Sequence, residues 1–212
     1  MTVGQNPGIV IVDYTMGNLR SVEKGFYAAG VKDVVVSGDP AVVAAARGIV
    51  VPGVGAFHDA AAHLTDSGLR DALLERAEAG VPLLGICLGM QLLATTGLED
   101  GEWDGLGLVP GVCERLPGGV KVPHIGWNTV EMPRPSALFD GIDDGTAFYF
   151  VHSYHLVPED PSAVIGRTVH GVPFAAAVQA RSVFGVQFHP EKSSEAGLRL
   201  LRNFATIVQE AR

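Results

Sequence analysis

The sequence predicts an α/β fold with a central, mostly parallel sheet, helices on both faces and antiparallel strands added in the second half. In the first half, short runs of Val, Ile and Leu alternate with helix-like segments, the order expected for parallel strands and their crossover helices. The second half is broken by Pro and Gly into short apolar segments. The chain has 212 residues, 47% hydrophobic and 18% charged, so it can bury a substantial core. We therefore expect a single domain over residues 1–212.

Buried strands and helices are expected to alternate through the first half. The strands are the apolar runs at residues 8–13, 34–36, 48–51 and 82–86. One helix should span residues 19–29, because Asn18 is a favourable N-cap and Gly30 a favourable stop. A further helix should span residues 68–79 and end at Gly80.

The second half should add antiparallel strands and hairpins to this sheet. The expected strands are at residues 108–112, 128–132, 147–151, 163–169, 174–180 and 183–187. An amphipathic helix at residues 193–211 closes the chain. Its apolar face would carry Leu198, Leu201, Phe204, Ala205 and Val208.

Composition argues against several classes of protein. The net charge is −8 and Lys and Arg form no cluster, whereas a nucleic-acid surface needs clustered positive charge. The two cysteines, Cys87 and Cys113, are too few for a disulfide framework and have no CxxC spacing. The N-terminus has no basic and apolar leader, and no apolar stretch reaches the roughly 18 residues of a membrane span. These features predict a cytoplasmic protein.

The strongest local signal for chemistry is the pentapeptide Gly-Ile-Cys-Leu-Gly at residues 85–89. It has the G-x-nucleophile-x-G form and lies between a buried strand and the helix-like stretch 88–93, as a nucleophile elbow requires. A helix N-terminus behind Cys87 would lower the pKa of the thiol and offer free backbone N–H groups. The alternative is a structural cysteine flanked by turn glycines.

The second signal is the His-Pro-Glu sequence at residues 189–191. In an extended chain, residues two apart project to the same side, so His189 and Glu191 should point together. Pro190 also biases His189 toward an extended conformation. A carboxylate beside an imidazole fixes its tautomer and stabilises its charged form, as the base for a cysteine needs. Taken alone, this segment favours a surface turn over a catalytic role. Together with the elbow, it predicts a Cys-His-Glu triad.

The third signal is the glycine-containing loop at residues 52–57, which follows the third strand. Its glycines let the backbone turn amide groups inward near Val54 and Gly55. With the amide of Leu88, such a loop could stabilise a tetrahedral oxyanion, although a plain strand-to-helix loop fits equally well.

Other residues gave weaker signals. His152 and His155 are expected to be structural, because no third ligand at suitable spacing accompanies them. His58 and His63, on a helix-like segment, receive no role. Cys113 should be inert. No metal and no organic cofactor is expected.

These motifs together resemble the class I glutamine amidotransferases, and within them the glutaminase subunits of imidazole glycerol phosphate synthase. The resemblance covers essentially the whole chain. Besides the GxCxGxQ and FHPE motifs, it rests on the segments DYTMGNLRSV (13–22), VPHIGWN (122–128), FVHSY (150–154) and FHPEKS (188–193). One departure is Thr15, where the family usually has glycine.

The resemblance implies a flavodoxin-like fold and a heterodimer with a cyclase subunit that is a (β/α)8 barrel. The pair would form imidazole glycerol phosphate and aminoimidazole carboxamide ribotide in histidine biosynthesis, using ammonia from L-glutamine. It implies that Gln91, Ser153 and Tyr154 contact glutamine. The residues expected toward the cyclase are Asn18, Trp127, Tyr149 and Lys192.

Three alternatives remain open at this point. The chain could be the glutaminase subunit of another amidotransferase, although residues 13–22 and 122–128 argue against it. It could be a catalytically silent regulatory subunit, although Cys87, His189 and Glu191 are all present. It could also be a cysteine hydrolase that acts alone on peptides or esters.

Overall fold

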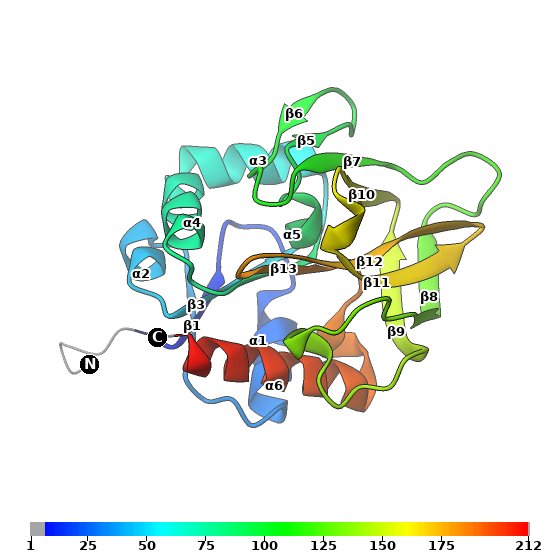
Figure 1. The fold of residues 1–212 in the computed structure, drawn as a ribbon. Helices are drawn as coiled ribbons and strands as arrows, with labels where there is room; N and C mark the ends of the chain where they lie inside the picture. Colours follow the sequence, from blue (N-terminus) through cyan, green and yellow to red (C-terminus); the bar gives the residue numbers. More distant parts are fainter. Residues whose placement is uncertain (1–6, 212) are drawn as a thin grey trace.

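The structure, a computed structural model, describes residues 7–211, and within them the chain forms a seven-stranded sheet between two layers of helices (Figure 1). The strand order is β11-β12-β13-β4-β3-β1-β2. The parallel strands are β1 (Ile9–Val12), β2 (Val34–Ser37), β3 (Gly48–Gly53), β4 (Leu83–Cys87) and β13 (Val183–Val186). The antiparallel strands are β11 (Val164–His170) and β12 (Val172–Ala180).

Helices cover both faces of the sheet because the parallel strands are apolar on both sides. Those on one face are α1 (Leu19–Ala28) and α6 (Ser194–Glu210) (Figure 1). Those on the other are α2 (Pro40–Ala44), α3 (Phe57–Asp66), α4 (Leu69–Glu78) and α5 (Leu88–Gln91). Along β1, Ile9 and Ile11 enter the core under α1 and α6, whereas Val10 and Val12 enter the opposite core.

Two smaller β structures lie beside the main sheet. The first joins β10 (Tyr154–Pro158), β7 (Gly111–Arg115), β5 (Thr96–Gly97) and β6 (Trp103–Asp104). The second is an antiparallel ribbon of β8 (His124–Val130) and β9 (Thr146–His152). Short 3-10 turns occur at Ala137–Phe139, Pro161–Ala163 and Pro190–Lys192.

The predicted α/β class is confirmed, and the strands and the two helices expected in the first half lie within a few residues of their predicted bounds. The helix α2 was not predicted, and α3 was expected only as a helix-like segment around His58 and His63. Asn18 occupies the N-cap of α1 as expected, but its side chain makes no capping hydrogen bond to the described residues. Its carbonyl instead accepts from the backbone N–H groups of Ser21 and Val22. The helix-like stretch after Cys87 is shorter than expected, because α5 ends at Gln91.

The prediction that all later strands join the main sheet antiparallel is wrong. Only β11 and β12 do so. The hairpin between β12 and β13 reverses the chain, so β13 runs parallel to β4 on its other side. The expected strand at 108–112 lies at 111–115 in the smaller sheet, and those at 128–132 and 147–151 form the β8–β9 ribbon. The alternation of apolar residues indicated strands but could not specify their partners.

The carboxyl ends of the parallel strands gather the segments that carry the sequence motifs. β1 leads into residues 13–18, β3 into residues 54–56, β4 ends at Cys87, and β13 leads into residues 187–191. Sites in open α/β sheets form at this edge.

Over residues 7–211, no helix is both long and apolar enough to cross a membrane.

Candidate active site

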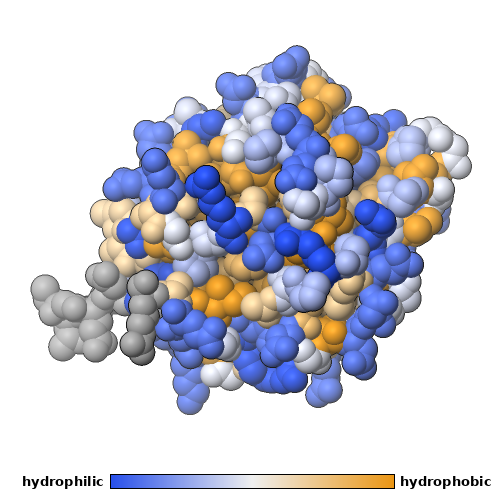
Figure 2. Space-filling view, viewed as in Figure 1, coloured by the Kyte–Doolittle hydropathy of each residue, from blue (hydrophilic) through white to orange (hydrophobic). Residues whose placement is uncertain are grey.

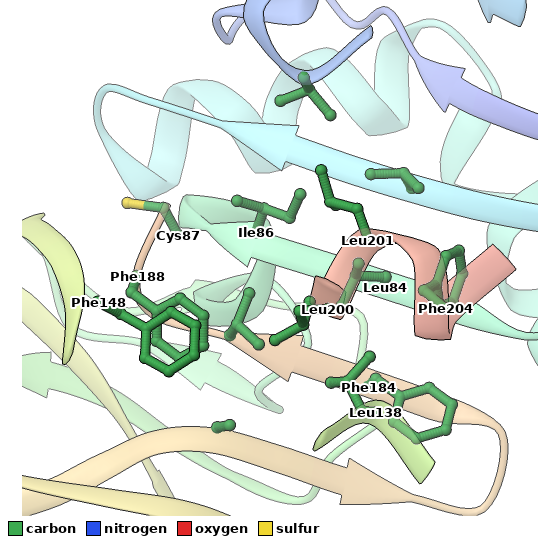
Figure 3. Close-up of a cluster of buried hydrophobic side chains, with 14 of the residues drawn as sticks. Leu84, Ile86, Cys87, Leu138, Phe148, Phe184, Phe188, Leu200, Leu201 and Phe204 are labelled. Carbon is green, nitrogen blue, oxygen red and sulfur yellow. The ribbon is translucent and has the colours of Figure 1, made fainter. Parts of the chain in front are cut away.

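Cys87 sits at a sharp turn from strand to helix. It is the last residue of β4, and α5 begins at Leu88. Its φ of 55° and ψ of −110° are strained for a residue with a side chain. The flanking glycines are needed: a Cβ at Gly85 would lie 2.5 Å from the Gly89 carbonyl oxygen, and one at Gly89 would collide with the carbonyl oxygen of Val51. The sulfur points away from Ile86 and the buried cluster behind it (Figure 3).

His189 and Glu191 form a buried pair. Nδ1 of His189 lies 2.9 Å from Oε1 of Glu191, and both side chains are almost fully buried. The expected extended chain is only partly present, because Pro190–Lys192 is a 3-10 turn that follows an extended His189. The two side chains meet nevertheless.

The electrostatics of the pair favour a charged imidazole. Burial alone lowers the pKa of His189, but its interactions with the side chains of Cys87 and Glu191 outweigh burial and raise the pKa to about 9. Among the described residues, Nε2 of His189 has no hydrogen-bond partner. That nitrogen is therefore free to exchange a proton with a reacting group.

A pocket of about 270 Å³ opens over Cys87. It includes all six residues assigned from the sequence to oxyanion or substrate binding, together with the nucleophile. Its lining is Val54, Gly55, Cys87, Leu88, Gln91, Glu99, Pro123, Val151, His152, Ser153 and Tyr154. Glu99, Pro123 and Val151 were not predicted from the sequence as site residues, and His152 was expected to be only structural.

The glycine loop after β3 forms one wall of this pocket. Gly53 pairs with Cys87 in the sheet, so the loop starts beside the nucleophile. Gly55 has a φ of 114°, and an added Cβ would lie 2.5 Å from Cε of Met16. The Tyr14 hydroxyl donates a 2.7 Å hydrogen bond to the Pro52 carbonyl. The loop is thus held by residues of the opening motif.

Gln91 connects the pocket wall to the nucleophile. Its Nε2 donates to the carbonyl oxygen of Tyr154 at 2.8 Å and to Oε1 of Gln187 at 3.2 Å. Nε2 of Gln187 lies 3.8 Å from the Cys87 sulfur. Gln187 was missed in the sequence, although its position two residues before His189 was an available signal.

Glu99 is the carboxylate in the pocket lining. Its Oε2 accepts a 2.6 Å hydrogen bond from the backbone N–H of Phe57, the first residue of α3. This bond holds the Glu99 side chain at the pocket, although Glu99 and Phe57 are 42 positions apart in the sequence. No sequence signal links these two residues.

The residues expected to face a partner lie partly together. Trp127 of β8 pairs with Tyr149 of β9, and their rings are 6.1 Å apart. Nζ of Lys192 lies 5.8 Å from the centre of the Tyr149 ring. Trp127 is 54% exposed. Asn18 is exposed at the start of α1.

The remaining candidates are placed as follows. Among residues 7–211, no group of three or more His, Cys, Asp or Glu side chains is arranged to hold a metal ion. Cys113 is buried, and burial raises the pKa of its thiol well above the usual range, which fits an inert group. His58 pairs with Asp59 at 3.1 Å.

The chain is similar to known proteins along nearly its whole length. The family model for glutamine amidotransferase class-I matches residues 10–208. The chain is 55% identical over 203 residues to imidazole glycerol phosphate synthase subunit HisH of Moorella thermoacetica, with 96% of each chain covered. It is 48% identical over 195 residues to the subunit of the same name from Aquifex aeolicus, covering 92% of this chain and 94% of that one.

Solved structures share the fold at lower identity. A crystal structure of a glutamine amidotransferase matches with a TM-score of 0.75 at 20% identity, covering 95% of this chain and 98% of that one. PurLQS from Thermotoga maritima matches with a TM-score of 0.74 at 20% identity, covering 96% and 99%.

Proposed function

The chain belongs to the class I glutamine amidotransferase family and, within it, to the HisH subunits of imidazole glycerol phosphate synthase, and on that premise we propose how its residues act. We propose that Cys87, His189 and Glu191 hydrolyse L-glutamine to L-glutamate and ammonia, and that the ammonia passes to a cyclase subunit. The observation that carries this proposal is the pocket that opens on Cys87 at the sharp turn into α5, together with the buried His189–Glu191 pair at the same edge of the sheet.

The reaction starts from a thiolate and an imidazolium. The raised pKa of His189 favours transfer of the Cys87 proton to its ring. The thiolate sulfur attacks the side-chain carboxamide carbon of glutamine and forms a tetrahedral intermediate. As the C–N bond breaks, His189 gives its proton to the leaving nitrogen, and ammonia departs from a thioester.

Hydrolysis then regenerates the site. Neutral His189 takes a proton from water, and the hydroxide attacks the thioester carbon. The S–C bond breaks, glutamate leaves, and the Cys87 thiolate faces the imidazolium again. Glu191 orients the ring through its 2.9 Å contact with Nδ1 and stabilises the positive charge.

Backbone amides stabilise the oxyanion. The N–H of Leu88 is the first of α5, where the helix leaves it without an intrahelical partner. A second amide comes from the loop near Val54 or Gly55. A flip of this loop on partner binding would present that amide and couple hydrolysis to the partner.

Substrate recognition uses the other pocket residues. Glutamine carries an α-ammonium, and the Glu99 carboxylate is the complementary charge in the lining. Gln91 and the backbone groups of Ser153 and Tyr154 contribute the remaining polar contacts.

The partner in this proposal is the cyclase subunit, a (β/α)8 barrel that docks near Asn18, Trp127, Tyr149 and Lys192. Ammonia released into water at neutral pH becomes ammonium, which is not nucleophilic, so a sealed interface is needed to deliver it. The cyclase then forms imidazole glycerol phosphate and aminoimidazole carboxamide ribotide. We also propose that the chain works in the cytoplasm as a single domain.

The test is glutamate release from glutamine by the purified chain, with and without the cyclase subunit and its nucleotide ligand. We expect a low rate alone and a large rise with the liganded partner. Cys87→Ser should abolish release in both conditions, while the complex should still use added ammonia.

Other outcomes would identify the alternatives. A silent regulatory subunit would give the same rate for the native chain and Cys87→Ser. Hydrolysis of peptides or esters without glutamine selectivity would indicate a stand-alone hydrolase. Glutaminase activity that a bound, ammonia-competent cyclase leaves unchanged would indicate a subunit that serves another synthase.

A further inference from the structure

Resting on the proposed glutaminase function, we propose that His124 and His152 are positioning residues that set the orientation of Gln91 through the backbone carbonyl of Tyr154. Neither imidazole takes part in the chemistry described above. Both are buried, and His152 lines the pocket. Their hydrogen bonds form a continuous path from β8 to the glutamine pocket.

The path meets the pocket at one oxygen atom. The carbonyl oxygen of Tyr154 lies 2.8 Å from Nδ1 of His152 and 2.8 Å from Nε2 of Gln91. A carbonyl oxygen has two lone pairs and only accepts hydrogen bonds. His152 and Gln91 therefore both donate to it, and the position of this oxygen depends on both side chains.

The same logic fixes the tautomers of both histidines. Since Nδ1 of His152 donates, Nε2 of a neutral ring must accept, and it lies 3.0 Å from Nδ1 of His124. Nδ1 of His124 then carries the proton. Its Nε2 accepts from Nδ2 of Asn128 at 3.4 Å. A single assignment of protons satisfies every contact on the path.

Both rings are kept neutral, which this assignment requires. Burial, reinforced by neighbouring histidines, lowers the pKa of His152 to about 3 and that of His124 to about 4. His170 stacks on His124 with ring centres 4.2 Å apart and bonds the Lys121 carbonyl through Nε2. At neutral pH each group on the path therefore donates to the next: Asn128 to His124, His124 to His152, and His152 to the Tyr154 carbonyl.

The consequence for the pocket concerns Gln91. Its two amide hydrogens are directed at the Tyr154 carbonyl and at Oε1 of Gln187, so Oε1 is the side-chain atom left for a ligand. Gln91 thus presents an acceptor, which selects a donor group such as an ammonium or a carboxamide N–H. Without the bond from His152, the carbonyl could rotate and Gln91 could present its amino group instead, which would repel the same ligand group.

The test compares His152→Phe with His152→Asn in the native complex with the cyclase. Phenylalanine fits among Phe150 and Phe174 but cannot donate, whereas the asparagine amide can donate from close to the position of Nδ1. Loss of a hydrogen bond worth roughly 1–1.5 kcal/mol corresponds to about a tenfold change. We expect His152→Phe to raise KM for glutamine about tenfold and His152→Asn to recover it to within about threefold.

Two controls separate positioning from packing. His155→Phe removes a neighbouring buried histidine, whose Nδ1 has no partner within residues 7–211, and should leave KM within about twofold of the native value. The rate at which iodoacetamide alkylates Cys87 does not depend on glutamine contacts. It should stay within about twofold in His152→Phe.

The proposal is wrong if His152→Phe leaves KM unchanged, if the Asn and Phe variants are equally impaired, or if alkylation slows in parallel with KM. If His152→Phe does not fold, KM for glutamine is compared between His124→Leu and His124→Asn. These variants test the same hydrogen-bonded path at the residue one step further from the pocket. If the native chain released no glutamate with its liganded partner, the proposed glutaminase function itself would be wrong.

Discussion

Thr15 has a strained backbone conformation. It has a φ of 71°, a region that β-branched residues rarely enter. Its backbone N–H bonds the Asp13 carboxylate at 3.0 Å, which holds the turn in place. Thr15→Gly should therefore stabilise the chain by about 1 kcal/mol, measured as a higher urea midpoint with an unchanged m-value.

The control for this prediction is a Thr-to-Gly change that should lower the free energy of unfolding instead of raising it. Thr129 is exposed on β8 without a positive φ, so Thr129→Gly should destabilise by roughly 0.5–1 kcal/mol. If Thr15→Gly destabilised to the same extent, the turn would not be strained in solution.

The His189–Glu191 pair should make stability depend on pH. The pKa of His189 is about 9 in the folded chain, above its ordinary value of 6.5. The folded state therefore holds a proton that the unfolded state releases between these values. The stabilisation is fully present below pH 6.5 and is lost as pH rises through 9.

Glu191→Gln removes one of the two groups that raise this pKa. The free energy of unfolding should then fall less steeply between pH 6.5 and 9, as measured by urea unfolding at several pH values. Glu195→Gln, at an exposed position in the first turn of α6, controls for the change in net charge. Equal slopes in the native chain and Glu191→Gln would show that the pair does not retain the proton.

At the level of elements, the elbow depends on the contact between α5 and β3. Gly89 of α5 packs so closely that a Cβ would collide with the carbonyl oxygen of Val51. Gly89→Ala should cost about 3 kcal/mol or more in the free energy of unfolding, because neither backbone can move without disturbing the sheet.

Gly118→Ala is the matched control, because an added Cβ there meets no described atom within 4 Å. We expect a change within about 0.5 kcal/mol. If Gly89→Ala were equally mild, the helix could shift away from β3, and the tight packing behind Cys87 would not be a requirement of the fold.

The elements that could be predicted are those with a local cause. Runs such as Ile9–Val12 are buried on both faces, so their apolar character alone indicated parallel strands. The pairing of β13 with β4 has no such cause, because it joins residues about 100 positions apart. The sequence also did not indicate that the β8–β9 ribbon is separate from the main sheet, because strand partners are decided by contacts between distant residues.

The residues of the site could likewise be predicted only where their placement has a local cause. Cys87 and the His189–Glu191 pair stand in short motifs whose backbone geometry is local. Glu99 reaches the pocket through a bond to Phe57, and the His124–His152 path needs residues from separate strands. Long-range hydrogen bonds of this kind leave no periodicity in the sequence.

The whole molecule concentrates its functional segments at one edge of the sheet. Figure 2 shows one face, with hydrophilic side chains interrupted by small hydrophobic areas. Ile125 and Trp127 of β8 are more than half exposed, while His124 of the same strand is buried. The outward face of β8 thus carries two exposed apolar side chains, and its inward face carries the histidine path. A partner that covers the outward face would contact the strand on which that path begins.

Trp127 should therefore be a main contact for the cyclase. Its exposed ring, edge-on to Tyr149, is the kind of rigid aromatic anchor that contributes about 2 kcal/mol or more at an interface. Trp127→Ala should weaken binding of the cyclase about 30-fold or more, as measured by titration calorimetry. It should also reduce the partner's stimulation of glutamate release when the partner is below saturation.

Tyr27→Ala provides the comparison. Tyr27 is 47% exposed but lies near the end of α1 opposite Asn18, so its removal should leave the affinity for the cyclase within about twofold. The proposed docking face would be wrong if Trp127→Ala bound the cyclase as tightly as the native chain and kept full coupling. If Tyr27→Ala weakened binding as much as Trp127→Ala, the contact would extend along α1 to the opposite edge of the sheet, and Trp127 would not be the main anchor of the interface.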